Sequence, residues 1–354
     1  MDLTGRVASR RCPVRLLITS DLHLTDRGEH TYRWDLFPRL REVVEAEAID
    51  VLAILGDITD RKDQHSSALV HQILATFQSL PVPLIFLKGN HDYVDEGSPF
   101  FDWLPAAGDA WEWYSQPAHV YGEMWGGMGV VMLPHTRDPE RAWAPLREVH
   151  PRLVLGHATI TGARAESGVL LEGICRDWLP EAPVTILGDV HVPQQLTSDL
   201  WYVGSPYHVR FGRVNYEPRF LVVEWAEDSD LLATRVRSIS TALARRIIYD
   251  VRNPEDLNRV PVIRTEDRLR IVVHQGPGTT PESWRAVAEA VAARVDKRAE
   301  IVPLIEQPEQ AAADARNAVR PEELFHAYCD QKGFDVDDVT AGFELLRGLI
   351  DRHA

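Results

Sequence analysis

The sequence predicts an α/β fold, because short apolar runs typical of buried strands alternate with segments of helical period. Five such runs lie at about residues 14–19, 50–55, 83–87, 153–156 and 184–187. Between the first three, apolar residues recur every three or four positions over 34–47 and 69–80, which predicts two helices. Strands joined by helices pair in parallel, so we expect their carboxyl ends along one sheet edge.

Length and composition limit the class of protein. The chain has 354 residues, of which 45% are hydrophobic and 26% charged, as in a globular protein with one large and one small domain. Its net charge of −15 argues against binding nucleic acid through a broad basic surface, but it suits carboxylates gathered around metal ions. A polyanionic substrate would then need a local basic groove, bound metal or a partner.

The sequence shows neither a membrane segment nor a secretion signal. No apolar run approaches the roughly 20 residues of a membrane helix, and the N-terminal MDLTGRVASRRCPVR has no apolar segment. Cys12, Cys175 and Cys329 are odd in number and far apart, which favours a reducing compartment without disulfides. We therefore expect a cytoplasmic protein without membrane contact, in the host cytoplasm if it is viral.

Each of the five apolar runs ends in side chains that can bind metal ions. In chain order these are Asp21 and His23, Asp57, Asn90 with His91 and Asp92, His157, and Asp189 with His191. A single Gly-Asp or Gly-His after a strand is usually a turn. Five such endings, all expected at strand ends, predict a functional site instead.

The residue types indicate two divalent ions. Asp, Asn and His without Cys suit hard or borderline ions such as Mn²⁺, Fe²⁺ or Zn²⁺, and the set exceeds the needs of one ion. In an extended segment alternate residues share a face, so Asp21 and His23 could point at one place. Two ions activate water and stabilise both oxygens in phosphoester hydrolysis. Asp57, alone after its glycine, is the expected bridge, and His91 the expected proton donor.

The motifs DLH, GD, GNHD, GH and G-x-x-H, in this order, resemble those of the calcineurin-like metallophosphoesterases over about residues 14–225. This resemblance implies a sandwich of two β-sheets flanked by helices. The segment YVGSPYHVRFGRVNYEPRFLVVE that follows is similar to one in SbcD-type DNA double-strand-break nucleases. The likeness then implies four parts: a nuclease domain over 1–238, a small α/β capping domain over 239–308, a linker over 309–320 and a C-terminal helical pair over 321–354.

Patterns after residue 238 agree with this division. RLRIVVHQGP and AEIVPLIEQ are typical of strands, and a helix between them should begin near Thr280 and Pro281. PEQAAADARNAVR has few large apolar residues, as in a linker. The last helix carries an apolar stripe that begins at Val339 and could fold back on the cap or dock on a partner helix. The resemblance favours docking on an SbcC-like coiled-coil ATPase, and it also implies a homodimer.

The resemblance further assigns ligands to two metal sites. One ion would be held by Asp21, His23, Asp57 and His191, and the other by Asp57, Asn90, His157 and Asp189. The family usually has a histidine where this chain has Asp189. Because aspartate can ligate Mn²⁺ and favours a harder ion, we expect LGDVH to be a variant metal motif. The open alternative is a weakened site in a slow or single-metal enzyme.

Two other histidines are secondary candidates. Some family members have a histidine three residues after the bridging aspartate, where this chain has Asp60; His65 could replace it, or it could be a capping or surface residue. His208 lies close to Arg210 and Arg213, where contact with phosphate and mere solvation are both open. The tryptophan-rich segment 100–125 is expected to pack rather than to stack on DNA bases.

These expectations describe a two-metal DNA exonuclease or endonuclease that uses Mn²⁺ or, in its place, Fe²⁺, Zn²⁺ or Mg²⁺. It would hydrolyse phosphodiester bonds as the nuclease subunit of an SbcC/SbcD-like recombination and repair complex. Two alternatives stay open. A metallophosphatase or small-molecule phosphodiesterase on the same fold is favoured by the acidic charge, and a non-catalytic scaffold has Asp189 as its only hint.

Overall fold

A computed structural model describes residues 14–125, 127–225, 234–252, 256, 264, 267–275 and 300–305. The chain divides into two compact units, and the first holds the described residues up to Tyr249 together with 264, 267–270 and 300. All metal-type motifs fall in this first unit. The expected helix at Thr280, the linker and the C-terminal helical pair lie outside the described residues.

The first sheet has six strands in the order β12-β11-β1-β2-β3-β4. Their bounds are β1 Val14–Thr19, β2 Val51–Ile54, β3 Leu84–Leu87, β4 Trp111–Tyr114, β11 Arg219–Trp225 and β12 Arg235–Ser240. Strands β1 to β4 are parallel, whereas β11 pairs antiparallel with β1 and with β12. The three expected strands are confirmed, and β4 emerges from the tryptophan-rich segment, where no strand was expected.

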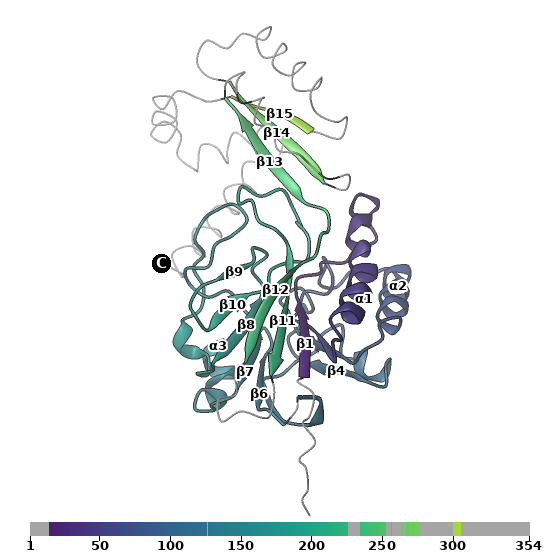
Figure 1. The fold of residues 1–354 in the computed structure, drawn as a ribbon, viewed down its shortest axis with the longest axis vertical. Helices are drawn as coiled ribbons and strands as arrows, with labels where there is room; N and C mark the ends of the chain where they lie inside the picture. Colours follow the sequence, from purple (N-terminus) through teal and green to yellow (C-terminus); the bar gives the residue numbers. More distant parts are fainter. Residues whose placement is uncertain are drawn as a thin grey trace, which may run out of the picture. The chain divides into compact units, whose positions relative to one another are not determined.

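The second sheet has the order β5-β6-β7-β8-β10-β9. Its strands are β5 Ala118–Val120, β6 Val130–Leu133, β7 Leu153–His157, β8 Val184–Gly188, β9 Gln194–Gln195 and β10 Leu200–Tyr202. The four central strands are parallel, and β5 and β9 pair antiparallel at the edges. The expected strands at 153–156 and 184–187 are therefore confirmed, as is the two-sheet α/β fold (Figure 1).

Alternation along the strands places the core on both faces of the first sheet. Leu17 packs in one cluster with residues of helices α1 (Leu36–Ala46) and α2 (Ser67–Gln78). Its neighbours Leu16 and Ile18 pack in another cluster that contains residues of the second sheet. The first sheet is thus covered by helices on one face and by the second sheet on the other.

The two expected helices are confirmed with shifted starts. Trp34 lies in a 3₁₀ helix, Gly28–Asp35, and α1 begins only at Leu36. Helix α2 begins after Ser66, whose hydroxyl accepts a bond from the backbone N–H of Leu69 at 3.1 Å. The remaining short elements of the first unit are α3 Pro139–Ala142 and the 3₁₀ helices Leu104–Ala106, Glu123–Trp125, Ala144–Leu146 and Arg176–Trp178.

A third sheet follows in the sequence, with the order β13-β14-β15. Its strands are β13 Arg246–Val251, β14 Arg268–Gln275 and β15 Glu300–Ile305. The two strands expected in the capping region are confirmed by β14 and β15. Among helices in the described part of the chain, none is long and apolar enough to cross a membrane.

Candidate metal centre

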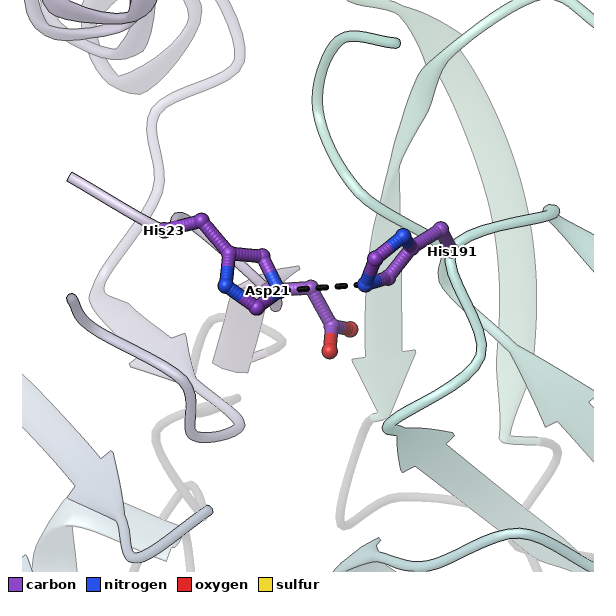
Figure 2. Close-up of side chains that lie close together, drawn as sticks. All are labelled: Asp21, His23 and His191. Atoms are coloured by element: carbon purple, nitrogen blue, oxygen red, sulfur yellow. Dashed lines mark hydrogen bonds between the residues drawn. The ribbon is translucent and has the colours of Figure 1, made fainter. Parts of the chain in front are cut away.

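The strand-end residues of both sheets meet at one place. In the first sheet, Asp21 and His23 follow β1, Asp57 follows β2, and Asn90 and His91 follow β3. In the second sheet, His157 ends β7, and Asp189 and His191 follow β8. Figure 2 shows Asp21 and His23 on one side, with His191 reaching toward them from the other. The site therefore lies between the carboxyl ends of two sheets, not along one sheet as the sequence led us to expect.

Three overlapping groups have ligand atoms within 4.8 Å of one another. They are Asp21 with His23 and His191, His23 with Asp57 and His91, and Asp21 with Asp57 and His157. Shared members join these groups into one cluster. Such a cluster offers more donor atoms than a single ion uses.

The first half of the cluster contains Asp21, His23, Asp57 and His191. In it, His23 and His191 point their Nε2 atoms at each other. Nε2 of His23 lies 3.0 Å from Nε2 of His191 (Figure 2) and 3.6 Å from Oδ2 of Asp57. Nδ1 of His191 lies 3.2 Å from Oε2 of Glu166, a partner that holds the proton on Nδ1 and leaves Nε2 as a ligand atom. This geometry fits one divalent ion.

In the second half, His157 is oriented in the same manner. Its Nδ1 donates to the carbonyl oxygen of Leu55 at 2.5 Å, and its Nε2 lies 3.5 Å from Oδ1 of Asp57 and 3.7 Å from Oδ1 of Asp189. Nε2 of His157 and Oδ1 of Asn90 are buried, and neither has a hydrogen-bond partner among the described residues. Buried acceptor atoms of this kind are costly unless paired, so they fit a second cation.

Asp57 faces both halves with different oxygens. Oδ2 is the atom close to His23, and Oδ1 is the atom close to His157. The side chain is almost fully buried. A carboxylate placed this way has the geometry of a bridge between two ions.

The backbone at the strand ends is left-handed rather than extended. Asp21, His23, Asp57 and Asp189 have φ of 55°, 44°, 54° and 86°, and they are four of six non-glycine residues with positive φ in the described part of the chain. The expected extended geometry of Asp21 and His23 is therefore wrong. Each such conformation costs on the order of 1 kcal/mol and is typical of functional sites.

Asp92, which follows the expected site residues, holds two of the loops together. Its carboxylate accepts backbone N–H groups from Asp57 and Ile58, both at 2.9 Å, and from Gly89 at 2.7 Å. Asp92 is fully buried. The sequence analysis named this residue of the GNHD motif among the side chains that can bind metal ions, but it predicted no supporting role for it.

Two further supporting residues were missed, and no signal in the sequence pointed to them. Glu166 holds His191, also lies 3.1 Å from Nε of Arg210, and comes from a loop far from any strand-end motif. Arg33 is buried and donates to the carbonyl oxygen of His23. Their roles depend on chain segments that meet only in the folded protein.

The cluster is electrostatically strained in the absence of a cation. Burial raises the pKa of Asp21 and raises that of Asp57 well above its ordinary value, to which the neighbouring carboxylates add. Burial alone would lower the pKa of His157, but Asp57, Asp189 and Asp21 outweigh it and bring the value to about 9. Burial lowers the pKa of His23, with His191 adding to the effect. Divalent cations would relieve the repulsion among the carboxylates.

His91 lies at the edge of the cluster. Its backbone N–H donates to Oδ1 of Asp57 at 2.8 Å, and its Nδ1 donates to the carbonyl oxygen of Asp60 at 2.8 Å. With Nδ1 engaged, Nε2 is the atom left for chemistry. His91, His23, Asp57, Asn90, Asp189 and His191 all line a cavity of about 550 Å³.

Asp189 is held in the same cavity by two bonds. Its Oδ2 accepts from the hydroxyl of Thr159 at 2.6 Å, and its backbone N–H points at the carboxylate of Asp21, 3.1 Å away. Thr159 thereby leaves Oδ1 directed at His157. The aspartate of LGDVH thus occupies a ligand position in the second half of the cluster.

The secondary candidates lie elsewhere. His65 stacks on Phe100 with ring centroids 4.0 Å apart and bonds the hydroxyl of Thr59, so it does not replace the missing histidine at Asp60. His208 is buried, with its two ring nitrogens each 3.0 Å from a backbone carbonyl oxygen, those of Arg246 and Tyr216. Neither histidine lines the cavity of the cluster.

The tryptophan-rich segment packs, as expected. Trp125 is buried between the sheets, and Trp103, Trp111 and Trp113 lie partly buried against the core on the helix side. Two of them belong to β4. These rings stabilise the edge of the first sheet.

Comparison with known proteins bears on the family. The model of the calcineurin-like phosphoesterase family matches residues 14–201. No curated protein sequence matches this chain significantly. Similar solved structures are a purple acid phosphatase from yellow lupin seeds (12% identity, TM-score 0.37) and a dimetal phosphatase from Danio rerio (10%, 0.36). Vps29 with Zn²⁺ from Entamoeba histolytica is another (12%, 0.28).

Coverage in these structures is partial. The alignments cover 66%, 65% and 64% of this chain, and 54%, 99% and 99% of the lupin, Danio and Entamoeba chains. The chain thus spans about half the length of the lupin enzyme, and similarities at this level do not bear on substrate. The family match is of a different kind, because it covers more than half of the 354 residues and includes every strand-end motif. This chain belongs to the calcineurin-like phosphoesterase family.

Proposed function

We propose that this protein is a two-metal phosphodiesterase that cleaves DNA. One ion would be held by Asp21, His23, Asp57 and His191, and the other by Asp57, Asn90, His157 and Asp189. The observation that carries the proposal is the carboxylate of Asp57, whose two oxygens face different histidines. When bound, the ions would polarise the phosphate and lower the pKa of the attacking water. The oxygen-rich donor set favours Mn²⁺, with Fe²⁺, Zn²⁺ and Mg²⁺ as the other candidates.

His91 is the proposed general acid. The Asp60 carbonyl keeps a proton on Nδ1, so Nε2 is the nitrogen left to act on the substrate in the cavity, and as the acid the ring is an imidazolium that gives up its Nε2 proton. The oxygen of a water bonds to phosphorus and the water releases one proton to solvent, the ester P–O bond breaks, and the leaving oxygen takes the Nε2 proton of His91, which the ring then regains from solvent. The Asp57 carboxylate orients this residue by accepting its backbone N–H.

DNA is favoured as substrate by the wall of the cavity. Arg210, Phe211 and Arg213 line it together with the ligands, and they come from the segment similar to SbcD-type nucleases. Cations beside a scissile phosphate suit a nucleic acid backbone. We extend the proposal to a homodimeric nuclease subunit that binds an SbcC-like ATPase through the C-terminal helical pair.

A second candidate is a metallophosphatase or small-molecule phosphodiesterase. The net charge of −15 favours it, because a small phosphoester needs no basic surface outside the site. The two candidates share the same ligands and the same acid. They differ only in what binds beyond the scissile phosphate.

The test compares substrates and one pair of variants. Purified protein with Mn²⁺ would be given end-labelled linear and hairpin DNA and, separately, a small phosphomonoester. We expect DNA cleavage, with a loss in kcat of about 10² to 10⁴ in His91→Ala and unchanged Mn²⁺ binding. His71→Ala, at an exposed histidine on α2, is the matched control and should retain full activity.

Two results would contradict the proposal. Turnover of the phosphomonoester far above that of DNA, both with and without an added ATPase partner, would decide for the phosphatase. Cleavage by His91→Ala at the wild-type rate would remove this residue as the acid.

A further inference from the structure

A second, smaller cavity of the first unit is lined by three arginines. Arg245, Arg246 and Arg268 border a space of about 140 Å³, into which Thr31 and Tyr32 also face as lining residues. A water molecule occupies about 30 Å³ of liquid, so the space exceeds a single water several-fold. We call these five residues the arginine pocket.

The charges of the three arginines are compensated to different degrees. Arg245 forms an ion pair with buried Asp267 at 2.6 Å, so its charge is largely neutralised. Arg246 is held by rings: its guanidinium lies 4.8 Å from the ring centroid of Tyr32, and its Nη2 lies 3.3 Å from Nδ1 of His30. Rings hold a guanidinium without cancelling its charge. The pocket thus keeps positive charge.

The surroundings of Arg246 and Arg268 indicate that the pocket can bind an anion. Nε of Arg246 is buried and has no hydrogen-bond partner among the described residues. Arg268 is exposed on β14 and is positioned by its backbone N–H, which donates to the carbonyl of Arg245 at 2.8 Å. One acid, Glu29, also lines the cavity, but it is 71% exposed and lies 3.6 Å from His30. An anion in the cavity would pair with the charges of Arg246 and exposed Arg268.

One aromatic ring connects the arginine pocket with the metal centre. Phe211 lines the large cavity that contains the ligands. The guanidinium carbons of Arg246 and Arg270 lie 5.6 and 4.1 Å from its ring centroid, and Arg270 also pairs with exposed Glu300 at 2.9 Å. Arg246 therefore contacts the wall of the large cavity and lines the small one.

We propose that the arginine pocket binds a second phosphate of the substrate, on the same strand as the phosphate at the metal centre. This inference rests on the proposed function, since it requires a substrate that is a chain of phosphodiesters. A strand that leaves the large cavity would cross Phe211 and meet Arg246. The pocket would supply the local basic groove that a chain of net charge −15 needs to hold a polyanion.

The test measures binding separately from cleavage. Protein freed of metal by EDTA is titrated against a short fluorescent single-stranded DNA at several salt concentrations, and anisotropy gives the Kd. Each phosphate contact on a single strand contributes about 0.7 to the slope of log affinity against log salt. We expect Arg268→Gln and Arg246→Gln each to lower the slope by about this amount and to weaken binding about tenfold.

Arg235→Gln is the matched control. Arg235 is exposed on β12 opposite Glu224, and Glu224 pairs with Arg15 at the start of β1, the end remote from the metal centre. This variant should bind as the wild type does. Circular dichroism checks that each variant is folded. Arg268→Gln changes an exposed side chain, so it should disturb folding less than Arg246→Gln.

The outcomes separate the pocket from the proposed function. A wild type that does not bind the strand, unchanged slopes in both pocket variants, or an equal loss in Arg235→Gln would each overturn the arginine pocket. If the wild type nevertheless cleaves DNA, the proposed function stands alone. If the slopes fall as expected but Mn²⁺-loaded protein cleaves no DNA, the pocket stands and the proposed function fails. Hydrolysis of bis(p-nitrophenyl) phosphate, which has one phosphate, should be equal in wild type and Arg235→Gln.

Discussion

At the scale of single residues, the ligands depend on side chains behind them. The carboxylate of Asp92 accepts hydrogen bonds from three backbone N–H groups, two of which belong to Asp57 and Ile58. These bonds fix the backbone of Asp57, the proposed bridging ligand. Glu166 does the same for the ring of His191. Substitutions at these two residues should therefore affect the metal centre without removing a ligand.

We expect Asp92→Asn to destabilise the protein by about 1–3 kcal/mol, because an amide has one acceptor oxygen and would turn its NH₂ toward backbone donors. Urea unfolding measures the free energy change. Asp95→Asn, three residues away and exposed, is the control and should change it by less than about 0.5 kcal/mol. Equal effects of the two variants would show that the buried bonds are unimportant.

Glu166→Gln should weaken Mn²⁺ binding by about 10- to 100-fold, since the amide no longer holds His191 as a carboxylate does. Calorimetric titration with Mn²⁺ gives this affinity without any substrate. Glu172→Gln, exposed in the same loop region, should bind as the wild type does. Unchanged affinity in Glu166→Gln would refute the positioning role.

How much of the site could be predicted also differs from residue to residue. The eight strand-end residues follow apolar runs and share ligand chemistry, so local sequence is enough to find them. Glu166 and Arg33 have no such context, because their partners are 25 and 10 residues away and belong to other loops. Asp92 is intermediate. It belongs to a recognisable motif, but its three hydrogen bonds are to backbone atoms, which no sequence pattern reports.

At the scale of elements, the strand ends are tightly packed turns. Gly56 has φ of +88°, and a Cβ there would lie 2.5 Å from Nδ1 of His157 and 2.7 Å from the backbone of Gly89. The ends of β2, β3 and β7 thus approach one another through a residue without a side chain. This close approach lets ligands from two sheets share one ion.

Gly56→Ala should therefore cost about 3 kcal/mol or more, from left-handed strain and overpacking together. Thermal and urea unfolding measure the loss. Gly97→Ala is the control, because its Cβ would meet only Oδ1 of Asp95, at 3.7 Å, and its φ is ordinary. A stable Gly56→Ala would mean that the strand ends can separate.

Continuous burial made several elements predictable, although the buried strands β6 and β11 were not among those expected. Strands β1, β2, β3, β7 and β8 are fully or largely buried, and helices α1 and α2 have clear apolar faces. The edge strands β4, β5 and β9 are only half-buried and short, so their residues carry little alternation. Their pairing comes from neighbours in the sheet, which local patterns do not contain.

At the scale of the whole molecule, acid should lower stability. Burial lowers the pKa of His208 and brings that of His135 to about 4. In the unfolded chain both pKa values lie near 6.5, so there the histidines bind protons that the folded protein does not. The contribution of these two histidines to the free energy of unfolding should therefore fall as the pH drops from about 6.5 toward 4. Urea unfolding at several pH values in this range measures how steeply the free energy of unfolding depends on pH. This dependence should be weaker in His208→Gln than in wild type, and an equal dependence would contradict the prediction.

Removal of metal should destabilise the first unit. Without cations, burial raises the pKa of both Asp21 and Asp57, and the neighbouring carboxylates Asp189 and Asp21 add to the effect at Asp21 and Asp57 respectively. Metal at about 100 times its Kd would add about 2.7 kcal/mol per site. We expect EDTA to lower the Tm of the wild type but not that of Asp57→Asn, as thermal unfolding would show. If neither EDTA nor Mn²⁺ changes the Tm of the wild type, the protein does not bind a stabilising metal ion.

The antiparallel pairing of β11 with β1, in which Val14 faces Trp225, has a consequence for synthesis. Strand β1 lies in the middle of its sheet, but its outer neighbour β11 is synthesised about 200 residues later. Until β11 emerges, β1 is an open apolar edge, and chains that end before residue 191 also lack the ligand His191. Nascent chains that stall before residue 219 would therefore be prone to aggregate, however complete their helices.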